Sequence, residues 1–237
     1  MRALHVVHDH YSPAELFVPP LEDAGFHVET VLAPDERLPE SLAGYDAFVV
    51  GGGVMDVAQR EELPYLAREI DLFAEALREG VPAVGLCLGA QLLTAAAGGE
   101  VVPSEPAEIG WAPVRRLPAA ADDPVAAALP ERFTAFEWHK FACRPPAGAE
   151  PLAENDVCVQ AFRVGPRAWG TQFHIEVTER ILRGWHREAA AALAENGWDD
   201  ARFEESLRTL LPPHMAIGEE MGRRFARIAR ERARRAA

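Results

Sequence analysis

The sequence predicts an α/β protein in which an open, mostly parallel sheet carries helices on both faces. Two observations support this class. Short, unbroken apolar runs, typical of strands covered on both sides, alternate with segments of helical periodicity. Glycines close several of the helical segments, so the order strand, helix, strand repeats and implies right-handed crossovers with parallel pairing.

The strands of the expected parallel region follow from these runs in chain order. The helix before the fourth strand begins at Pro64 and ends at Gly80, and its apolar residues recur at helical spacing. A capping-box pattern at Ser12 to Glu15 begins an earlier helix, which Pro19 and Pro20 interrupt. We expect strands at residues 3–7, 26–32, 45–50 and 81–86.

The texture of the sequence changes between Glu100 and Val164, where prolines break short strand-like pieces. We expect paired strands at 133–141 and 157–164, and one short helix within 120–129. Together these pieces predict a small antiparallel flap beside the main sheet.

The part after Thr178 predicts helices at 179–195 and 201–211, the second ended by Pro212 and Pro213, and a last helix with an apolar face. Arginines crowd the end of that helix. Because the rest of the chain is acidic, a solvated face is favoured over a nucleic-acid or phosphate patch. These helices would also suit a subunit interface, so a homodimer stays open. The arginines are Arg223, Arg224, Arg227, Arg230, Arg232, Arg234 and Arg235.

Length and composition predict one domain over residues 1–237, with a core of about 3–178 and a helical extension of about 179–237. The 237 residues are 49% hydrophobic, which is enough for a full core. A net charge of −13 argues against a general nucleic-acid binder. Three cysteines without a C-x-x-C pair, no signal-peptide pattern and no long apolar span predict a cytoplasmic protein that does not enter a membrane.

The run from Pro82 to Leu93 organises the chain around Cys87. It predicts a strand, a sharp turn and a helix, with Gly85 and Gly89 on either side of the cysteine. A G-x-C-x-G run at such a junction is the thiol form of a nucleophile elbow, and the helix N-terminus favours the thiolate. A buried structural cysteine is the alternative that a lone cysteine in an apolar run usually represents.

Three further features favour the catalytic interpretation. A cysteine nucleophile needs a base and an orienting partner, and His174 with Glu176 suits these roles, since residues two apart in a strand point to the same side. Gly52 and Gly53 follow an expected strand, and their bare amides suit an oxyanion. Gln91 lies four residues after the cysteine.

Together these residues resemble the class I (triad) glutamine amidotransferase domain, whose pattern is a G-x-C-x-G-x-Q elbow, an earlier Gly-Gly turn and a late Q-F-H-x-E. The resemblance runs from about Val6 to Thr178 in family order and implies a flavodoxin-like fold. Three runs are more narrowly similar to stand-alone, GMP-synthase-like members: Glu108 to Trp111, Phe136 to His139, and Gln160 to Phe162.

The resemblance also implies a mechanism. Cys87 would attack the γ-carboxamide of glutamine, with Gly52, Gly53 and Leu88 supplying the oxyanion hole. His174 would protonate the departing ammonia and then activate water to hydrolyse the glutamyl thioester. Glu176 would hold the His174 tautomer. This half-reaction needs no metal or organic cofactor.

Family likeness assigns the substrate pocket to Gln91 and to a loop with residues Trp138, His139, Lys140 and Phe141. Phe141 stands where many members have aspartate. His139 beside Trp138 is as consistent with an aromatic pair covering the sheet edge as with a substrate contact. In a second departure, Ile175 stands where many members have proline, and it keeps the spacing of the pair on either side.

Three functions remain open from the sequence. The first is a glutamine amidotransferase-type hydrolase that releases ammonia to water or to a separate synthase subunit. The second is a γ-glutamyl peptidase or hydrolase acting on a γ-glutamyl conjugate. The third is a non-catalytic binding module on the same fold. The cluster His8-Asp9-His10 is expected to be a polar loop, because it lacks a clear fourth metal ligand.

Overall fold

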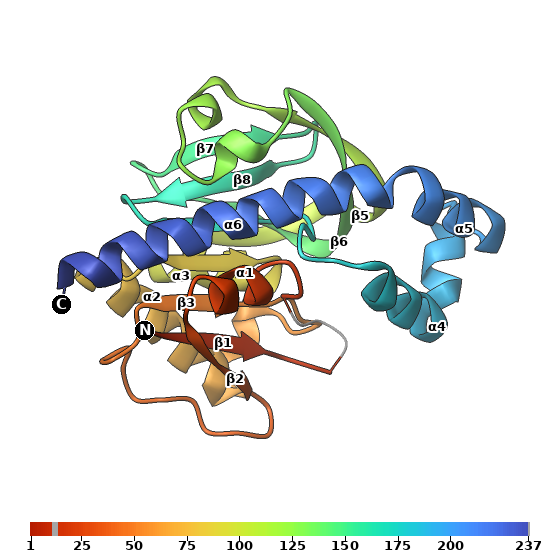
Figure 1. The fold of residues 1–237 in the computed structure, drawn as a ribbon. Coiled ribbons are helices and arrows are strands. Elements are labelled where there is room, and N and C mark those ends of the chain that lie inside the picture. Colours follow the sequence, from red (N-terminus) through yellow and green to blue (C-terminus); the bar gives the residue numbers. More distant parts are fainter. Residues whose placement is uncertain (11–13, 237) are drawn as a thin grey trace.

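The computed structural model describes residues 1–10 and 14–236 (Figure 1). The expected capping box at residues 12–15 therefore lies partly outside the described residues. Nine strands form one sheet in the order β2-β1-β3-β4-β9-β8-β7-β5-β6. The strands are β1 Arg2–Val7, β2 His27–Leu32, β3 Ala47–Val50, β4 Ala83–Leu86, β5 Glu100–Arg116, β6 Arg132–Arg144, β7 Glu150–Glu154, β8 Val159–Val164 and β9 Ala168–Thr171.

The sheet has a parallel half and an antiparallel half. Strands β2, β1, β3, β4 and β9 pair in parallel, and β8, β7, β5 and β6 continue from β9 in antiparallel pairs. The predicted α/β class is confirmed. The antiparallel region is continuous with the main sheet, and β9, which belongs to both halves, leads directly into the segment that carries His174.

Helices cover both faces of the sheet, as the pattern predicted. Helices α1 and α6 lie on one face, where Phe17, Met221 and Phe225 join the core (Figure 1). Helices α2 and α3 cover the other face, where Phe73 packs on Phe48 with ring centroids 4.9 Å apart. The helices are α1 Val18–Asp23, α2 Pro64–Glu79, α3 Leu88–Ala96, α4 Glu179–Glu195, α5 Asp200–Thr209 and α6 Leu211–Ala236.

Prolines shape the boundaries differently from the prediction at two places. Pro212 and Pro213 lie in the first turn of α6 and do not end α5, because proline suits a helix start, where its missing N–H has no intrahelical acceptor. Strand β5 is one long strand and not a series of pieces. Its pairing with β6 shifts register between Pro103 and Glu108, so a bulge absorbs the prolines.

Two pairings in the antiparallel half also differ from the prediction. Strand β6 pairs with β5, and β8 pairs with β7 and β9, so the two strands expected to pair with each other do not. Two short 3₁₀ helices, Pro118–Ala121 and Ala126–Ala128, replace the single helix expected there. A third, Val57–Glu61, begins at a capping box on Asp56 in a segment expected to be loop.

The helical extension packs on the sheet and leaves most of its arginines solvated. Helices α4 to α6 contribute Ile181, Leu182 and Phe203 to a cluster with Trp111 and Phe136 of the sheet. Arginines of α6 form ion pairs with acidic neighbours, among them Arg223 and Arg224 with Glu220 and Arg232 with Asp46. In the part of the chain that the structure describes, no helix is long and apolar enough to cross a membrane.

Candidate active site

Cys87 lies at the turn between β4 and α3 in a backbone conformation that side chains rarely adopt. Its φ of 50° is the one positive value among the described non-glycine residues. The turn is tight because both flanking glycines touch backbone. A Cβ on Gly85 would come within 2.3 Å of the Gly89 carbonyl oxygen, and a Cβ on Gly89 within 2.4 Å of the Val50 oxygen. This geometry is that of a nucleophile elbow, with the sulfur above the first turn of α3.

His174 and Glu176 meet as the spacing predicts, but in a turn and not in a strand. Strand β9 ends at Thr171, and the two residues follow in the connection to α4. The His174 Nδ1 lies 2.8 Å from Glu176 Oε1, which leaves Nε2 for another partner. Gly52 touches both the imidazole and the cysteine, since a Cβ there would lie 2.9 Å from His174 Cε1 and 3.6 Å from Cys87 Cβ. The residues expected to form the triad therefore lie together.

The electrostatics of this group favour an imidazolium. Burial alone would lower the pKa of His174, but the Cys87 thiolate and the Glu176 carboxylate outweigh burial and raise that pKa well above its usual value. Both side chains are nearly inaccessible, with Cys87 and His174 each 4% exposed. A thiolate–imidazolium pair held by a carboxylate is the arrangement that activates a cysteine nucleophile.

The glycine turn after β3 is held in place by a buried ion pair that the sequence interpretation missed. His8 Nδ1 lies 2.9 Å from the carbonyl oxygen of Gly52, and Nε2 lies 3.1 Å from both carboxylate oxygens of Glu69. Both ring nitrogens face acceptors, so His8 donates from both as an imidazolium. The Glu69 carboxylate raises the pKa of His8 against the opposing effect of burial.

This pair corrects the expectation of a polar loop at His8-Asp9-His10, because the His8 side chain is fully buried. A signal for its partner was present in the sequence. Glu69 lies on the core-facing stripe of α2, between Leu66 and Phe73, and a charged residue on an apolar face requires a buried partner.

The residues expected around the substrate lie on α3 and β6. Gln91 donates from Nε2 to the carbonyl oxygen of Phe141 at 3.2 Å, and the Cys87 sulfur lies 3.9 Å from the carbonyl oxygen of Trp138. These contacts bring the backbone of β6 against the elbow. Lys140 is exposed, and the His139 side chain points away into a buried cluster of acidic groups.

That cluster contains Glu108, Glu137, His139 and Cys158. The register of β5 and β6 places Glu108 opposite His139, and Glu137 lies two residues before His139 on the same face. Burial would lower the pKa of His139, but the two glutamates raise it to about 10. Burial raises the pKa of Glu137, and burial together with Glu108 raises the pKa of the Cys158 thiol. Cys143 is also buried, which raises its pKa to about 12.

Three further side chains touch the catalytic group without having been singled out from the sequence. The Gln172 amide nitrogen lies 3.8 Å from the Cys87 sulfur. Trp185 of α4 packs edge-on against the His174 ring, with centroids 4.8 Å apart, and His214 of α6 bonds the His174 carbonyl oxygen at 2.8 Å. The helical extension therefore helps to fix the imidazole, which no local motif in α4 or α6 announces.

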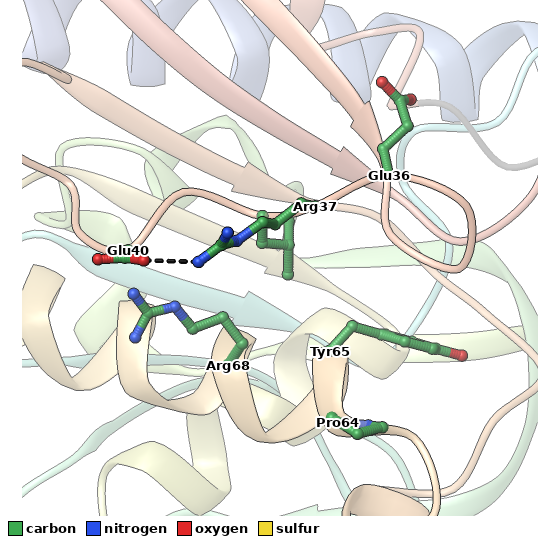
Figure 2. A pocket seen from close by; sticks show the side chains of 7 residues that line it. Glu36, Arg37, Glu40, Pro64, Tyr65 and Arg68 are labelled. Atoms are coloured by element: carbon green, nitrogen blue, oxygen red, sulfur yellow. Dashed lines mark hydrogen bonds and ion pairs between the residues drawn. The ribbon is translucent and has the colours of Figure 1, made fainter.

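A surface pocket lies apart from this site. It is lined by the loop that holds Glu36, Arg37, Leu38 and Glu40 and by the start of α2, with Arg37 paired to Glu40 at 2.6 Å (Figure 2). None of its lining residues belongs to the group around Cys87. Its charged side chains are largely solvated, so the catalytic geometry and not the pocket identifies the candidate active site.

Comparisons with known proteins agree with this site. Residues 6–183 match the family model described as glutamine amidotransferase class-I. The glutamine amidotransferase-like protein YfeJ of Salmonella typhimurium is 30% identical over 82% of this chain and 84% of its own length. A γ-glutamyl-L-1-hydroxyisopropylamide hydrolase from a Pseudomonas species is 28% identical over 78% of this chain and 67% of its own length. One subunit of the glutamine-hydrolysing GMP synthase of Archaeoglobus fulgidus is 32% identical over 73% and 88%.

A solved structure shows the same architecture. The glutamine amidotransferase of Thermotoga maritima superposes with a TM-score of 0.78 at 26% identity, over 94% of this chain and 98% of that protein. The family model spans well over half of the chain, from β1 into α4. The chain therefore belongs to the class I glutamine amidotransferase family.

Proposed function

We propose that this protein hydrolyses the γ-carboxamide of glutamine through a glutamyl thioester on Cys87. One observation carries the proposal: the strained elbow cysteine lies beside a buried histidine whose Nδ1 is bonded to Glu176 at 2.8 Å. These three side chains supply a nucleophile, a base and an orienting carboxylate, as acyl transfer requires.

The reaction begins with attack of the Cys87 thiolate on the amide carbon. A carbon–sulfur bond forms and the carbonyl electrons move to oxygen. The imidazolium of His174 then gives its Nε2 proton to the amide nitrogen, the carbon–nitrogen bond breaks, and ammonia leaves. In the second half, His174 takes a proton from water, hydroxide attacks the thioester, and the thiolate departs with release of glutamate.

The oxyanion hole is assigned to backbone N–H groups of the glycine turn and of Leu88. Leu88 is the first residue of α3, so its N–H has no intrahelical acceptor. The Gly52–Gly53 peptide is trans, so the carbonyl that His8 binds and the N–H of Gly53 point in opposite directions. His8 thus supports Gly53 as a donor by fixing this peptide.

The recipient of the ammonia distinguishes the finer alternatives. A γ-glutamyl conjugate is a second candidate substrate, favoured by the relative whose name describes hydrolysis of a γ-glutamyl amide. A separate synthase subunit that receives ammonia is favoured by the likeness to one subunit of a GMP synthase. The same thioester serves both, because only the leaving nitrogen and its destination differ.

The decisive experiment compares glutamine with a panel of γ-glutamyl amides, using purified protein alone. Release of ammonia from glutamine, lost in Cys87→Ser and kept in Cys158→Ser, would support the glutaminase. Turnover of substituted amides without turnover of glutamine would replace it by the γ-glutamyl hydrolase. No turnover, together with no reaction of Cys87 with a glutamine-analogue electrophile, would contradict both and favour the binding module.

A further inference from the structure

A second group of ligand-type side chains lies in the antiparallel half of the sheet. Glu108 comes from β5, Glu137 and His139 come from β6, and Cys158 lies in the bend before β8. The carboxylate, imidazole and thiol atoms of Glu108, His139 and Cys158 all lie within 4.8 Å of one another. Carboxylate, imidazole and thiolate together are the ligand types that zinc accepts.

The spacing of these atoms suits a tetrahedral site. His139 Nε2 lies 3.2 Å from Glu108 Oε2 and 3.2 Å from Glu137 Oε2, and the Cys158 sulfur lies 3.9 Å from Glu108 Oε2. Ligands held about 2.0–2.3 Å from a zinc ion at tetrahedral angles are separated by roughly 3.3–3.8 Å. The distances therefore need only small adjustments for one ion to contact all four side chains.

The hydrogen bonding of the cluster is incomplete in a way that points to a cation. Both carboxylate oxygens of Glu137 and the Nε2 of His139 are buried without a hydrogen bond of acceptable geometry. The Glu137 side chain is fully buried. A buried carboxylate without such bonds is costly unless it faces a positive charge, so the point between these three atoms requires a positive charge.

The surrounding groups hold these side chains as metal ligands are held. His139 donates from Nδ1 to the carbonyl oxygen of Phe141 at 2.9 Å, which directs the Nε2 lone pair at the two glutamates. Asn155 donates to Glu108 Oε1 at 2.6 Å and accepts from the backbone N–H of Cys158 at 3.0 Å, so it orients two members at once. Such outer bonds orient the ligands of metal sites and set their basicity.

We propose that Glu108, Glu137, His139 and Cys158 bind one Zn²⁺ ion. The nitrogen and sulfur donors favour zinc over magnesium or calcium, which prefer oxygen ligands. The ion would join β5, β6 and the start of β8. Strand β6 also presents the backbone of Trp138 and Phe141 to Cys87 and Gln91, so the zinc would brace one wall of the active site without entering the reaction.

Metal content tests this site without substrate, so its outcome is independent of amide hydrolysis. Full-length protein purified without chelator, or stripped under native conditions and reloaded with zinc, should hold one Zn²⁺ per chain by elemental mass spectrometry. Cys158→Ser should weaken zinc binding at least about 100-fold in competition with a chromogenic chelator. Cys143→Ser is the matched control, because Cys143 is a buried thiol that bonds Gln172.

Cobalt reports the ligands directly. Co²⁺-loaded wild type should show a thiolate-to-metal charge-transfer band that Cys143→Ser keeps and Cys158→Ser loses, while Glu137→Gln should weaken Co²⁺ binding with the protein still folded by circular dichroism. Folded protein that takes up no zinc would overturn the proposal, and a His139 Nε2 proton that persists in NMR spectra with added zinc would assign the positive charge to that proton. A charge-transfer band retained in Cys158→Ser would remove the thiol from the site.

Discussion

The molecule holds two groups of cysteine, histidine and glutamate, and their surroundings assign them opposite chemistry. Cys87 lies strained above the first turn of α3, and its histidine has one nitrogen on Glu176 and the other left for the sulfur. Cys158 lies in an ordinary bend, and the free nitrogen of its histidine faces two carboxylates. The comparison teaches that residue types alone do not make a nucleophile. The helix N-terminus and the nitrogen that faces the sulfur do.

The largest expected difference between the two groups is the effect of removing each sulfur. Cys87→Ser should lower amide hydrolysis by roughly 10⁴-fold or more, because no covalent intermediate forms. Cys158→Ser should change kcat by less than about tenfold, since that thiol touches no reacting atom. Steady-state ammonia release checks both, with circular dichroism to verify folding. Equal losses in the two variants would break the comparison.

The two histidine-bound carboxylates should differ next. Glu176→Gln removes the acceptor that fixes the His174 tautomer, and we expect kcat to fall by about 10³–10⁴-fold. Glu137→Gln alters only the second group and should leave kcat within about tenfold of wild type. Single-turnover measurement of thioester formation separates this effect from product release. A larger loss in Glu137→Gln than in Glu176→Gln would reverse the assignment.

The glycine turn belongs to the first group alone. Gly52→Ala would place a methyl group 2.9 Å from His174 Cε1, so the imidazole or the turn must shift. We expect a fall of about 10²–10³-fold in kcat, comparable to losing one oxyanion donor. Gly148→Ala is the control for backbone strain, because Gly148 also has a positive φ but has open space around it. Unchanged activity in Gly52→Ala would separate this turn from the reaction.

His8 should act as a positioning residue for the same turn. His8→Gln loses the charged contact with Glu69 and weakens the bond to the Gly52 carbonyl, and we expect kcat to fall by about tenfold with KM nearly unchanged. A purely structural role would lower thermal stability without this split. A variant with a raised KM and a normal kcat would contradict the assignment.

The smallest effect is a pH dependence of stability. The groups around the His8 imidazole are Glu69 on α2, the Gly52 carbonyl, Asp9, His5 on β1 and the ring of Tyr65. Because the folded pKa of His8 is raised above its usual 6.5, its contribution is complete below that pH and is lost as pH rises through the folded pKa. The difference in melting temperature between wild type and His8→Gln should therefore narrow at alkaline pH. A difference that widens would show the opposite sign.

Local patterns predicted the elbow and most strands, because each depends on residues close in sequence. Gly85, Cys87 and Gly89 specify their own turn. The spacing of His174 and Glu176 placed them together correctly, although the reason given, a strand, was wrong. Long-range pairings were harder. The register of β5 with β6 decides that Glu108 meets His139, and the prolines of β5 hid that strand.

The measurement that tests the central claim most directly is intact-protein mass spectrometry after mixing with glutamine and with γ-glutamyl amides, followed by peptide mapping. We predict one transient glutamyl adduct per chain, located on Cys87 and absent in Cys87→Ser. An adduct on Cys158, or full turnover in Cys87→Ser, would contradict the account.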